Sequence, residues 1–158
     1  MRDATFEEGR EAPLNLGAGD AEDLRVLSAL VQDAVFPGSE MRWEAKRRRF
    51  ALLLNRFRWE DRLAAEARGR AYERARAVLA FENVLRVSSQ GVTPKDRDTI
   101  LSLLALEFEP AGETGGFVTL VLAGDGAIRL EVEALEARLR DVTRPYATPS
   151  GKAPDHGA

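Results

Sequence analysis

Apolar residues recur at every second position in several segments of this sequence, and this alternation constrains the fold more than any other feature. Successive side chains of a β-strand point to opposite faces, so a half-buried strand alternates apolar and polar residues. Turn-forming residues separate most of these segments, which predicts a mostly antiparallel sheet. The predicted strands cover residues 13–16, 40–44, 48–59, 77–87, 99–108, 117–123 and 127–132.

Helical spacing is found in two further segments. The first begins at Asp20, whose carboxylate can accept hydrogen bonds from the first helical turn, and ends at Pro37-Gly38. The second runs from Glu133 to about Asp141. Residues 60–75 are rich in Ala, Arg and Glu and form an excursion, for which the sequence leaves loop and helix both open. The apolar helix faces are Leu24, Leu27, Val31, Ala34 and Val35, and Val132, Leu135, Leu139 and Val142.

These elements predict an α+β fold with a mostly antiparallel curled sheet, one helix in the N-terminal half and one C-terminal helix. A small barrel plugged by the last helix, as in pleckstrin-homology-like folds, is an alternative that implies no function. The chain has 158 residues, which is typical of one domain. We expect a single domain over 13–142, a flexible leader over 1–12 and a flexible tail over 143–158.

The composition excludes several classes of chemistry. The sequence contains no Cys and one His, His156, which is the third residue from its end. Thiolate nucleophiles, zinc ribbons, iron–sulfur ligation and an internal imidazole base are therefore excluded. We expect no enzyme activity, no cofactor, no metal and no catalytic residue. There is no apolar run of roughly 18 to 20 residues and no signal-peptide layout, which predicts a cytoplasmic protein that does not enter the membrane.

One glycine-containing motif resembles a dinucleotide-binding turn. Gly17-Ala18-Gly19-Asp20-Ala21-Glu22 lies between a predicted strand and a predicted helix, as such a turn does. Its chemistry is unsuitable, because carboxylates stand where the helix would receive a pyrophosphate. We interpret the motif as a turn followed by an acidic helix cap.

Positive charge is concentrated near the middle of the chain. Residues 42–76 contain 12 Lys+Arg and 5 Asp+Glu, a local balance of +7, whereas the rest of the chain has a balance of -10. Arginine guanidinium groups and aromatic rings together can hold phosphates or stack on bases. The candidate residues for binding an anionic partner are Arg42, Trp43, Lys46, Arg47, Arg48, Arg49, Arg56, Arg58 and Trp59.

Other interpretations of these charges remain open. The cations can instead block edge-to-edge strand pairing, or form surface ion pairs with the acidic remainder. Two carboxylate pairs at strand spacing, Glu107 with Glu109 and Glu131 with Glu133, could chelate a cation but are more typical of a wet strand face. We expect the amide of Asn55 to bond backbone, and Tyr146 would anchor the tail if the tail docks.

Segments spread over most of residues 14–142 resemble a chiefly alphaproteobacterial family, domain of unknown function 2948. They are Asp23-Leu24 with Ser28 and Gln32-Asp33-Ala34, Phe50 to Phe57 with Trp59-Glu60, Leu101 to Ala105, and Ile128 to Glu133. The resemblance implies a bacterial, single-domain, cytosolic protein. It carries no catalytic or binding residue over to this chain.

Three functional hypotheses follow. The first is a small non-enzymatic interaction module that presents the basic hairpin to an anionic partner, either a nucleic acid or an acidic protein. The second is an enzyme or ligand binder with a cleft lined by Glu107, Glu131 or Glu133. The third is a homo-oligomeric scaffold that pairs through an exposed strand edge. The chain would be a monomer or a small homo-oligomer.

Overall fold

The computed structural model describes residues 13–92 and 97–154. Within these residues, one sheet of eleven strands is accompanied by two α-helices, α2 (Ala21–Leu30) and α3 (Arg62–Arg68). The strands are β1 (Asn15–Ala18), β2 (Ala34–Pro37), β3 (Met41–Glu44), β4 (Arg49–Phe57), β5 (Glu73–Phe81), β6 (Val84–Gln90), β7 (Ile100–Ala111), β8 (Gly115–Leu122), β9 (Ala127–Val132), β10 (Ala137–Asp141) and β11 (Tyr146–Ala147).

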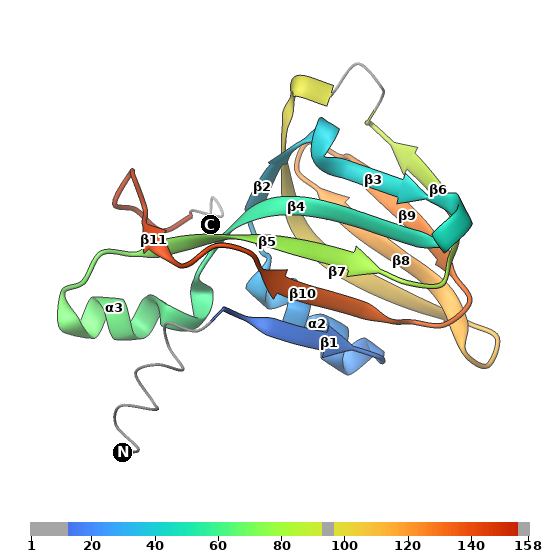
Figure 1. Ribbon diagram of the computed structural model, residues 1–158, viewed down its shortest axis with the longest axis horizontal. Helices are drawn as coiled ribbons and strands as arrows, with labels where there is room; N and C mark the ends of the chain where they lie inside the picture. The colour runs from blue at the N-terminus through green and yellow to red at the C-terminus, as the bar shows by residue number, and fades with distance from the viewer. Residues whose placement is uncertain (1–12, 93–96, 155–158) are drawn as a thin grey trace.

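All strand pairings in the described residues are antiparallel, and the main order is β1-β10-β5-β4-β2-β7-β8-β9-β6. β3 is added to β4 and β11 to β5. Figure 1 shows the sheet curling so that β1, β10, β5, β4 and β3 form a front layer and β7, β8 and β9 lie behind it, with α2 below. The core fills the space between the layers, and the α+β prediction is confirmed as an open antiparallel sheet with two helices.

Helix α2 begins as predicted and ends earlier than predicted. The side chain of Asp20 accepts a hydrogen bond of 2.7 Å from the Asp23 amide, so the glycine motif is a turn with an acidic cap. The helix stops at Leu30, because Asp33 takes a left-handed φ of 61° and its amide bonds the Leu103 carbonyl. Residues 34–37, predicted as helix, form β2 and pair with β7.

Residues 77–87, predicted as one strand, belong to two. Asn83 has a φ of 58° and turns the chain between β5 and β6. β5 pairs with β4 and β10 in the front layer, whereas β6 pairs with β9 at the far end of the sheet. The apolar alternation continues across this left-handed turn residue. The sequence pattern therefore predicted one strand where the structure has two.

A register shift in β7 changes which residues face the core. The pairing with β8 is irregular between Leu103 and Ala105, as in a β-bulge. Leu103 and Leu106 are therefore buried, while Ile100 and Leu104 are exposed. The next hairpin agrees with the prediction, because Gly124-Asp125-Gly126 joins β8 and β9.

The prediction of a C-terminal helix over 133–141 is wrong, because residues 137–141 form β10. This strand pairs with β1 on one side and β5 on the other. Ala137, Leu139 and Asp141 point into the core, and Arg138 and Arg140 point out. Val142, predicted to be on the apolar helix face, is exposed. Sheet pairing outweighs a helical spacing that rested on only four apolar residues.

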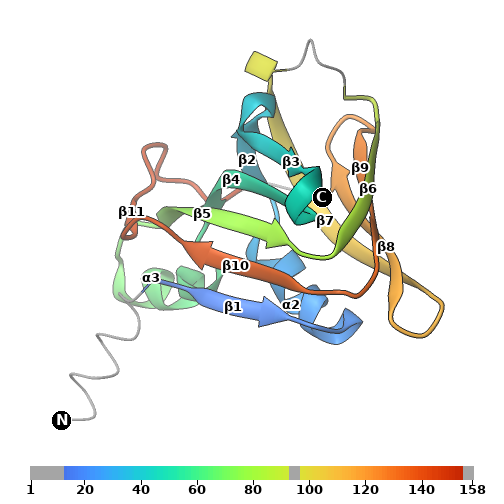
Figure 2. The same ribbon diagram turned by 45° about the vertical axis from the view of Figure 1, so that its right-hand side comes forward.

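The excursion at 60–75 is part helical. It contains the short 3-10 helix η3 (Trp59–Asp61) and α3, which Gly69 ends with a φ of 63°. Figures 1 and 2 show α3 projecting beside the sheet rather than covering it. Neither helix of the described residues is long and apolar enough to cross a membrane.

Part of the segment expected to be a flexible tail lies in the sheet. In β11, Tyr146 pairs with Arg74 and Ala147 with Glu73, and the amide of the buried Thr148 bonds the Tyr72 carbonyl. The expected leader over 1–12 and His156 lie outside the described residues.

Candidate anion-binding site

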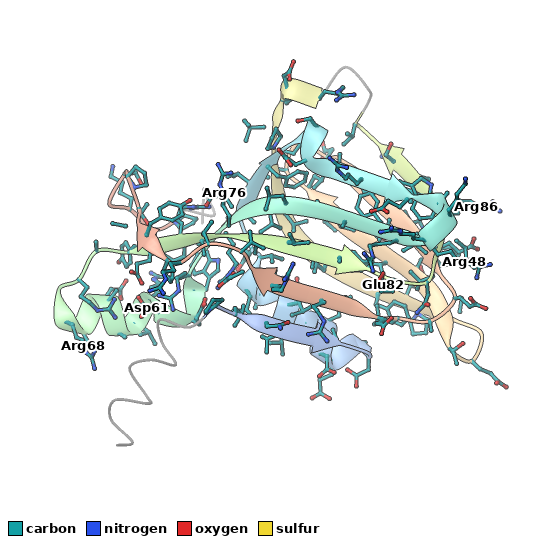
Figure 3. All side chains as sticks on the ribbon, in the orientation of Figure 1. Arg48, Asp61, Arg68, Arg76, Glu82 and Arg86 are labelled. Atoms are coloured by element: carbon teal, nitrogen blue, oxygen red, sulfur yellow. The ribbon has the colours of Figure 1, made fainter. Side chains whose placement is uncertain are left out.

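The predicted basic hairpin is formed by β3, the 3-10 helix η2 (Ala45–Arg47) and β4. Glu44 pairs with Arg49, and the chain reverses between them through Arg48, whose φ of 54° is left-handed. This turn exposes Lys46, Arg47 and Arg48 to solvent. Figure 3 shows Arg48 at the end of the hairpin, on the same side of the molecule as Glu82 and Arg86.

The cations of the hairpin differ in how they are neutralised. Arg47 Nη1 lies 3.6 Å from Glu44 Oε2, and Arg48 Nη1 donates to Glu133 Oε2 at 3.1 Å. Such exposed pairs contribute about 0–1 kcal/mol and break readily. Arg49 is held more closely, because its Nε donates to both carboxylate oxygens of Glu82 at 2.8 and 2.9 Å. These hydrogen bonds raise the pKa of Arg49.

Arg42 and Lys46 are the least restrained of these cations. Both side chains are exposed, and neither forms an ion pair with any residue in 13–92 or 97–154. Arg42 lies on the outer face of the front layer, opposite Ala51 of β4. Its charge is therefore available to an external anion.

The two tryptophans have different environments. Trp43 is 38% exposed, but it follows Arg42 directly on β3 and so points to the opposite face of the strand. Trp59 lies edge-on to Phe57, with ring centroids 4.7 Å apart, and its Nε1 donates to the Gln32 carbonyl at 2.9 Å. Only Trp43 lies on the hairpin.

Arg56, a predicted binding residue, is completely buried. Its Nε and Nη2 donate to Asp141 at 2.9 Å each, and its Nη1 and Nη2 donate to Glu60 at 2.9 and 2.7 Å. Burial lowers the pKa of Arg56, but the hydrogen bonds to Glu60 and Asp141 outweigh this effect and raise the pKa overall. The Arg56 guanidinium is therefore part of the core and cannot reach a partner.

Arg58 is also buried inside the protein. Its Nη1 donates to Glu73, and its guanidinium lies 3.7 Å from both Glu60 and Asp61. Asp61 in turn accepts two hydrogen bonds of 3.0 Å from Arg70, which lower its pKa against the opposing effect of burial. These charges connect β4, η3 and β5, so they fix the excursion to the sheet.

The side-chain amide of Asn55 bonds two other side chains, so the prediction that it bonds backbone is wrong. Its Oδ1 accepts from Arg74 Nε at 2.6 Å, and its Nδ2 donates to the hydroxyl of Tyr146, also at 2.6 Å. Burial lowers the pKa of Arg74. Tyr146 therefore fastens β11 to β4 and β5, in agreement with the idea that it could anchor the tail.

Strand β10 carries exposed cations that were not predicted as binding residues, because a helix was predicted in this segment. Arg138 lies opposite Ala80 and Gly17, and Arg140 lies opposite Val78 and Asn15, all on the outer face of the front layer. Alternation in Ala137-Arg138-Leu139-Arg140 was the signal that could have shown this. With Arg42 and Arg76 they form what we call the basic sheet face; Arg76, on β5, is labelled in Figure 3.

A shallow groove of about 870 Å³ lies on this layer, over β4, β5 and β10. Its floor consists of small or short side chains, and charged side chains surround the floor. The small side chains and the charged side chains both come from alternate residues of neighbouring strands, which share the outer face of the sheet. The floor includes Gly17, Ala51, Val78 and Ala80, and the surrounding charges include Arg49, Arg138, Arg140, Glu44, Glu82 and Glu136.

The fold keeps the first predicted carboxylate pair, Glu107 and Glu109, on one face of β7 and separates the second pair, Glu131 and Glu133. Glu107, Glu109 and Glu131 lie on the outer face of β7 and β9, whereas Glu133 follows β9 and pairs with Arg48. Glu109 and Glu131 each lie 3.8 Å from an arginine, Arg129 and Arg86 respectively. In the part of the chain that the structure describes, no group of three or more His, Cys, Asp or Glu could hold a metal ion.

The fold and the surface together define an α+β protein whose outer sheet face and hairpin carry excess positive charge. The family model described as Protein of unknown function (DUF2948) matches residues 14–156. The chain therefore belongs to this family, as the resemblance implied. Comparison with curated proteins finds no match, and neither does comparison with solved structures.

Proposed function

We propose that this protein is a non-enzymatic interaction module that binds an anionic partner, a nucleic acid or an acidic protein, through the end of its β3–β4 hairpin. The single observation that carries the proposal is the density of exposed charge there. Residues 42–49 contain five Lys+Arg and one Glu. Three of these cations follow one another along the exposed turn.

The binding surface is smaller than the sequence predicted. Arg42, Lys46, Arg47 and Arg48 form it, with Trp43 on the opposite face of β3. Arg49 is bound closely to Glu82, and the burial of Arg56 and Arg58 removes both from contact with a partner. Because the pairs of Arg47 and Arg48 are exposed, an incoming phosphate or carboxylate can replace Glu44 or Glu133 at little cost.

The enzyme and ligand-binder hypothesis has weaker support. Two of its three carboxylates, Glu131 and Glu133, each lie beside an arginine. A bacterial origin, a cytoplasmic location and a monomeric or small homo-oligomeric state are parts of our proposal. The proposal does not depend on grouping the curled sheet with pleckstrin-homology-like folds.

The proposal is tested by measuring binding of fluorescent RNA, DNA and heparin over a salt series. Each cation that contacts a phosphate contributes about one unit to the slope of log affinity against log salt. Lys46→Ala/Arg47→Ala should weaken binding and lower that slope by about two. The matched control is Arg62→Ala/Arg68→Ala on α3, which removes the same charge from exposed sites away from the hairpin.

Wild-type protein that binds none of these polyanions at low salt would contradict the nucleic-acid form of the proposal. The acidic-protein form is then tested with poly-glutamate under the same conditions. Equal effects of the two double variants would show that net charge, rather than the hairpin, determines binding.

A further inference from the structure

The groove over β4, β5 and β10 has a floor that a bound chain could approach closely. Ala51 and Ala80 are direct cross-strand partners on the outer face, and Ala80 is in turn opposite Arg138 of β10. Beyond β10, Gly17 of β1 lies opposite Arg138, and a Cβ atom at Gly17 would stand 3.3 Å from its Nη2. Small residues on β4, β5 and β1 thus flank Arg138, and the guanidinium of Arg138 lies over Gly17.

The charges around this floor change sign along the strands. At one end, Glu44, Glu82 and Glu136 surround the single guanidinium of Arg49; the Glu82 amide bonds the Glu136 carbonyl at 2.9 Å. Glu44 also lies 3.6 Å from Arg47, and Glu82 is bound to Arg49, so Glu136 is the carboxylate at this end that forms no ion pair with the described residues. Further along β10 lie Arg138 and Arg140, of which Arg138 donates to Asn15 and Arg140 forms no ion pair with the residues that the structure describes.

We infer that this groove binds an extended segment of a partner protein, with acidic side chains over Arg138 and Arg140 and a basic side chain over Glu136. This inference goes beyond the proposed function, because the groove is a second surface that does not include the exposed cations of the hairpin. Arg138 and Arg140 are two residues apart on a strand, which places them about 6.6–6.8 Å apart. Alternate side chains of an extended peptide have the same spacing, and a guanidinium binds a carboxylate through two parallel hydrogen bonds.

The change of sign favours a polypeptide over a nucleic acid. A nucleic-acid backbone is negative along its whole length, so a strand that follows the groove past Arg138 would meet Glu136 and Glu82. Among the residues that the structure describes, no aromatic side chain lines the groove to stack on bases. A peptide can vary its charge residue by residue and can therefore match both ends.

The test is a nuclear magnetic resonance titration of the isotope-labelled full chain with a synthetic octapeptide. The probe carries two Lys near one end and two Glu, separated by one Ser, near the other. We expect saturable shifts of the amides of Ala51, Ala80 and Arg138. Arg138→Glu/Arg140→Glu should weaken binding at least about tenfold. The matched control, Arg86→Glu/Arg129→Glu, makes the same charge change on the other layer and should change affinity less than about twofold.

A second variant tests the groove without changing charge. Ala80→Gln places a larger neutral side chain on the floor and should also weaken peptide binding, while the circular dichroism spectrum shows whether each variant is folded. The inference is overturned by the absence of saturable shifts, by equal loss in both charge-reversal variants, or by an oligothymidylate that gives stronger shifts at the same amides than the peptide does.

The two proposals fail in different ways. If heparin binds at the hairpin and the peptide does not bind in the groove, only the present inference is overturned. If Lys46→Ala/Arg47→Ala leaves heparin binding unchanged while the peptide still shifts the groove amides, the hairpin proposal is overturned and the groove remains supported.

Discussion

Arg56 of β4 and Asp141 of β10 form an ion pair through two hydrogen bonds of 2.9 Å, although they are 85 residues apart in the chain. β5 lies between their strands, so the pair spans three strands on the inner face of the front layer. The second oxygen of Asp141 also accepts a hydrogen bond of 3.1 Å from the Leu14 amide. A cation at the centre of the basic segment therefore holds the fold together.

Removing one partner of this buried pair should destabilise the protein strongly. Asp141→Ala leaves the Arg56 charge without its main core partner, which typically costs about 3–5 kcal/mol. Urea denaturation followed by tryptophan fluorescence measures this change. Glu133→Ala, which removes the exposed partner of Arg48, should cost less than about 1 kcal/mol. Similar small losses in both variants would contradict the assignment of Arg56 to the core.

Stability should depend on pH through Asp61. Hydrogen bonds from Arg70 lower the pKa of Asp61, burial opposes this, and the charge of Arg58 lowers it further. A carboxyl group with a lowered pKa stabilises the folded state above its unfolded pKa of about 3.9, and this contribution is lost as the pH falls through the folded value. Wild type should therefore exceed Asp61→Asn in stability at neutral pH, and the difference should shrink in acid. A difference that is constant from neutral to acidic pH would contradict this role.

Gly116 of β8 should not tolerate a side chain. A Cβ atom there would lie 2.3 Å from the Glu109 carbonyl oxygen and 2.9 Å from the Phe108 ring. Gly116→Ala should therefore lower the free energy of unfolding by about 1–3 kcal/mol or more. Gly19→Ala is the control, because nothing lies within 4 Å of its added Cβ. Thermal unfolding of both variants checks the register of β7 and β8.

Two substitutions can test whether residues 137–141 form a strand, as in the structure, or the helix that the apolar spacing predicted. In β10 Leu139 is buried and Val142 is exposed, whereas the predicted helix placed both on its apolar face. Leu139→Ala should cost about 2–5 kcal/mol, and Val142→Ser should stay within about 0.5 kcal/mol. A large loss for Val142→Ser, measured by urea denaturation, would favour the helix.

Local signals in the sequence predicted the elements that depend on local contacts. The β8–β9 hairpin has clear alternation on both sides of Gly124-Asp125-Gly126, and Asp20 caps α2 with its own side chain. Where alternation and helical spacing coincide, as in 34–36 and 137–142, the sequence could not decide. Sheet neighbours distant in the chain made the choice there: β7 for β2, and β1 with β5 for β10.

The sequence predicted only part of the candidate site, because the rest of the site depends on residues that are distant in the chain. The exposure of Lys46, Arg47 and Arg48 follows from a charged turn, which the sequence shows directly. The burial of Arg56 and Arg58 depends on Asp141 and Glu73, which only the folded chain brings near. Arg138 and Arg140 were overlooked because a helix was predicted in their place.

The most direct test of the central claim is where a polyanion contacts the protein. Titration of the isotope-labelled chain with a heparin oligosaccharide should shift the amides of Lys46, Arg47 and Arg48 most, and high salt should reverse these shifts. The absence of shifts at low salt, or the largest shifts at Arg62 and Arg68 on α3, would contradict the claim that the hairpin binds an anionic partner.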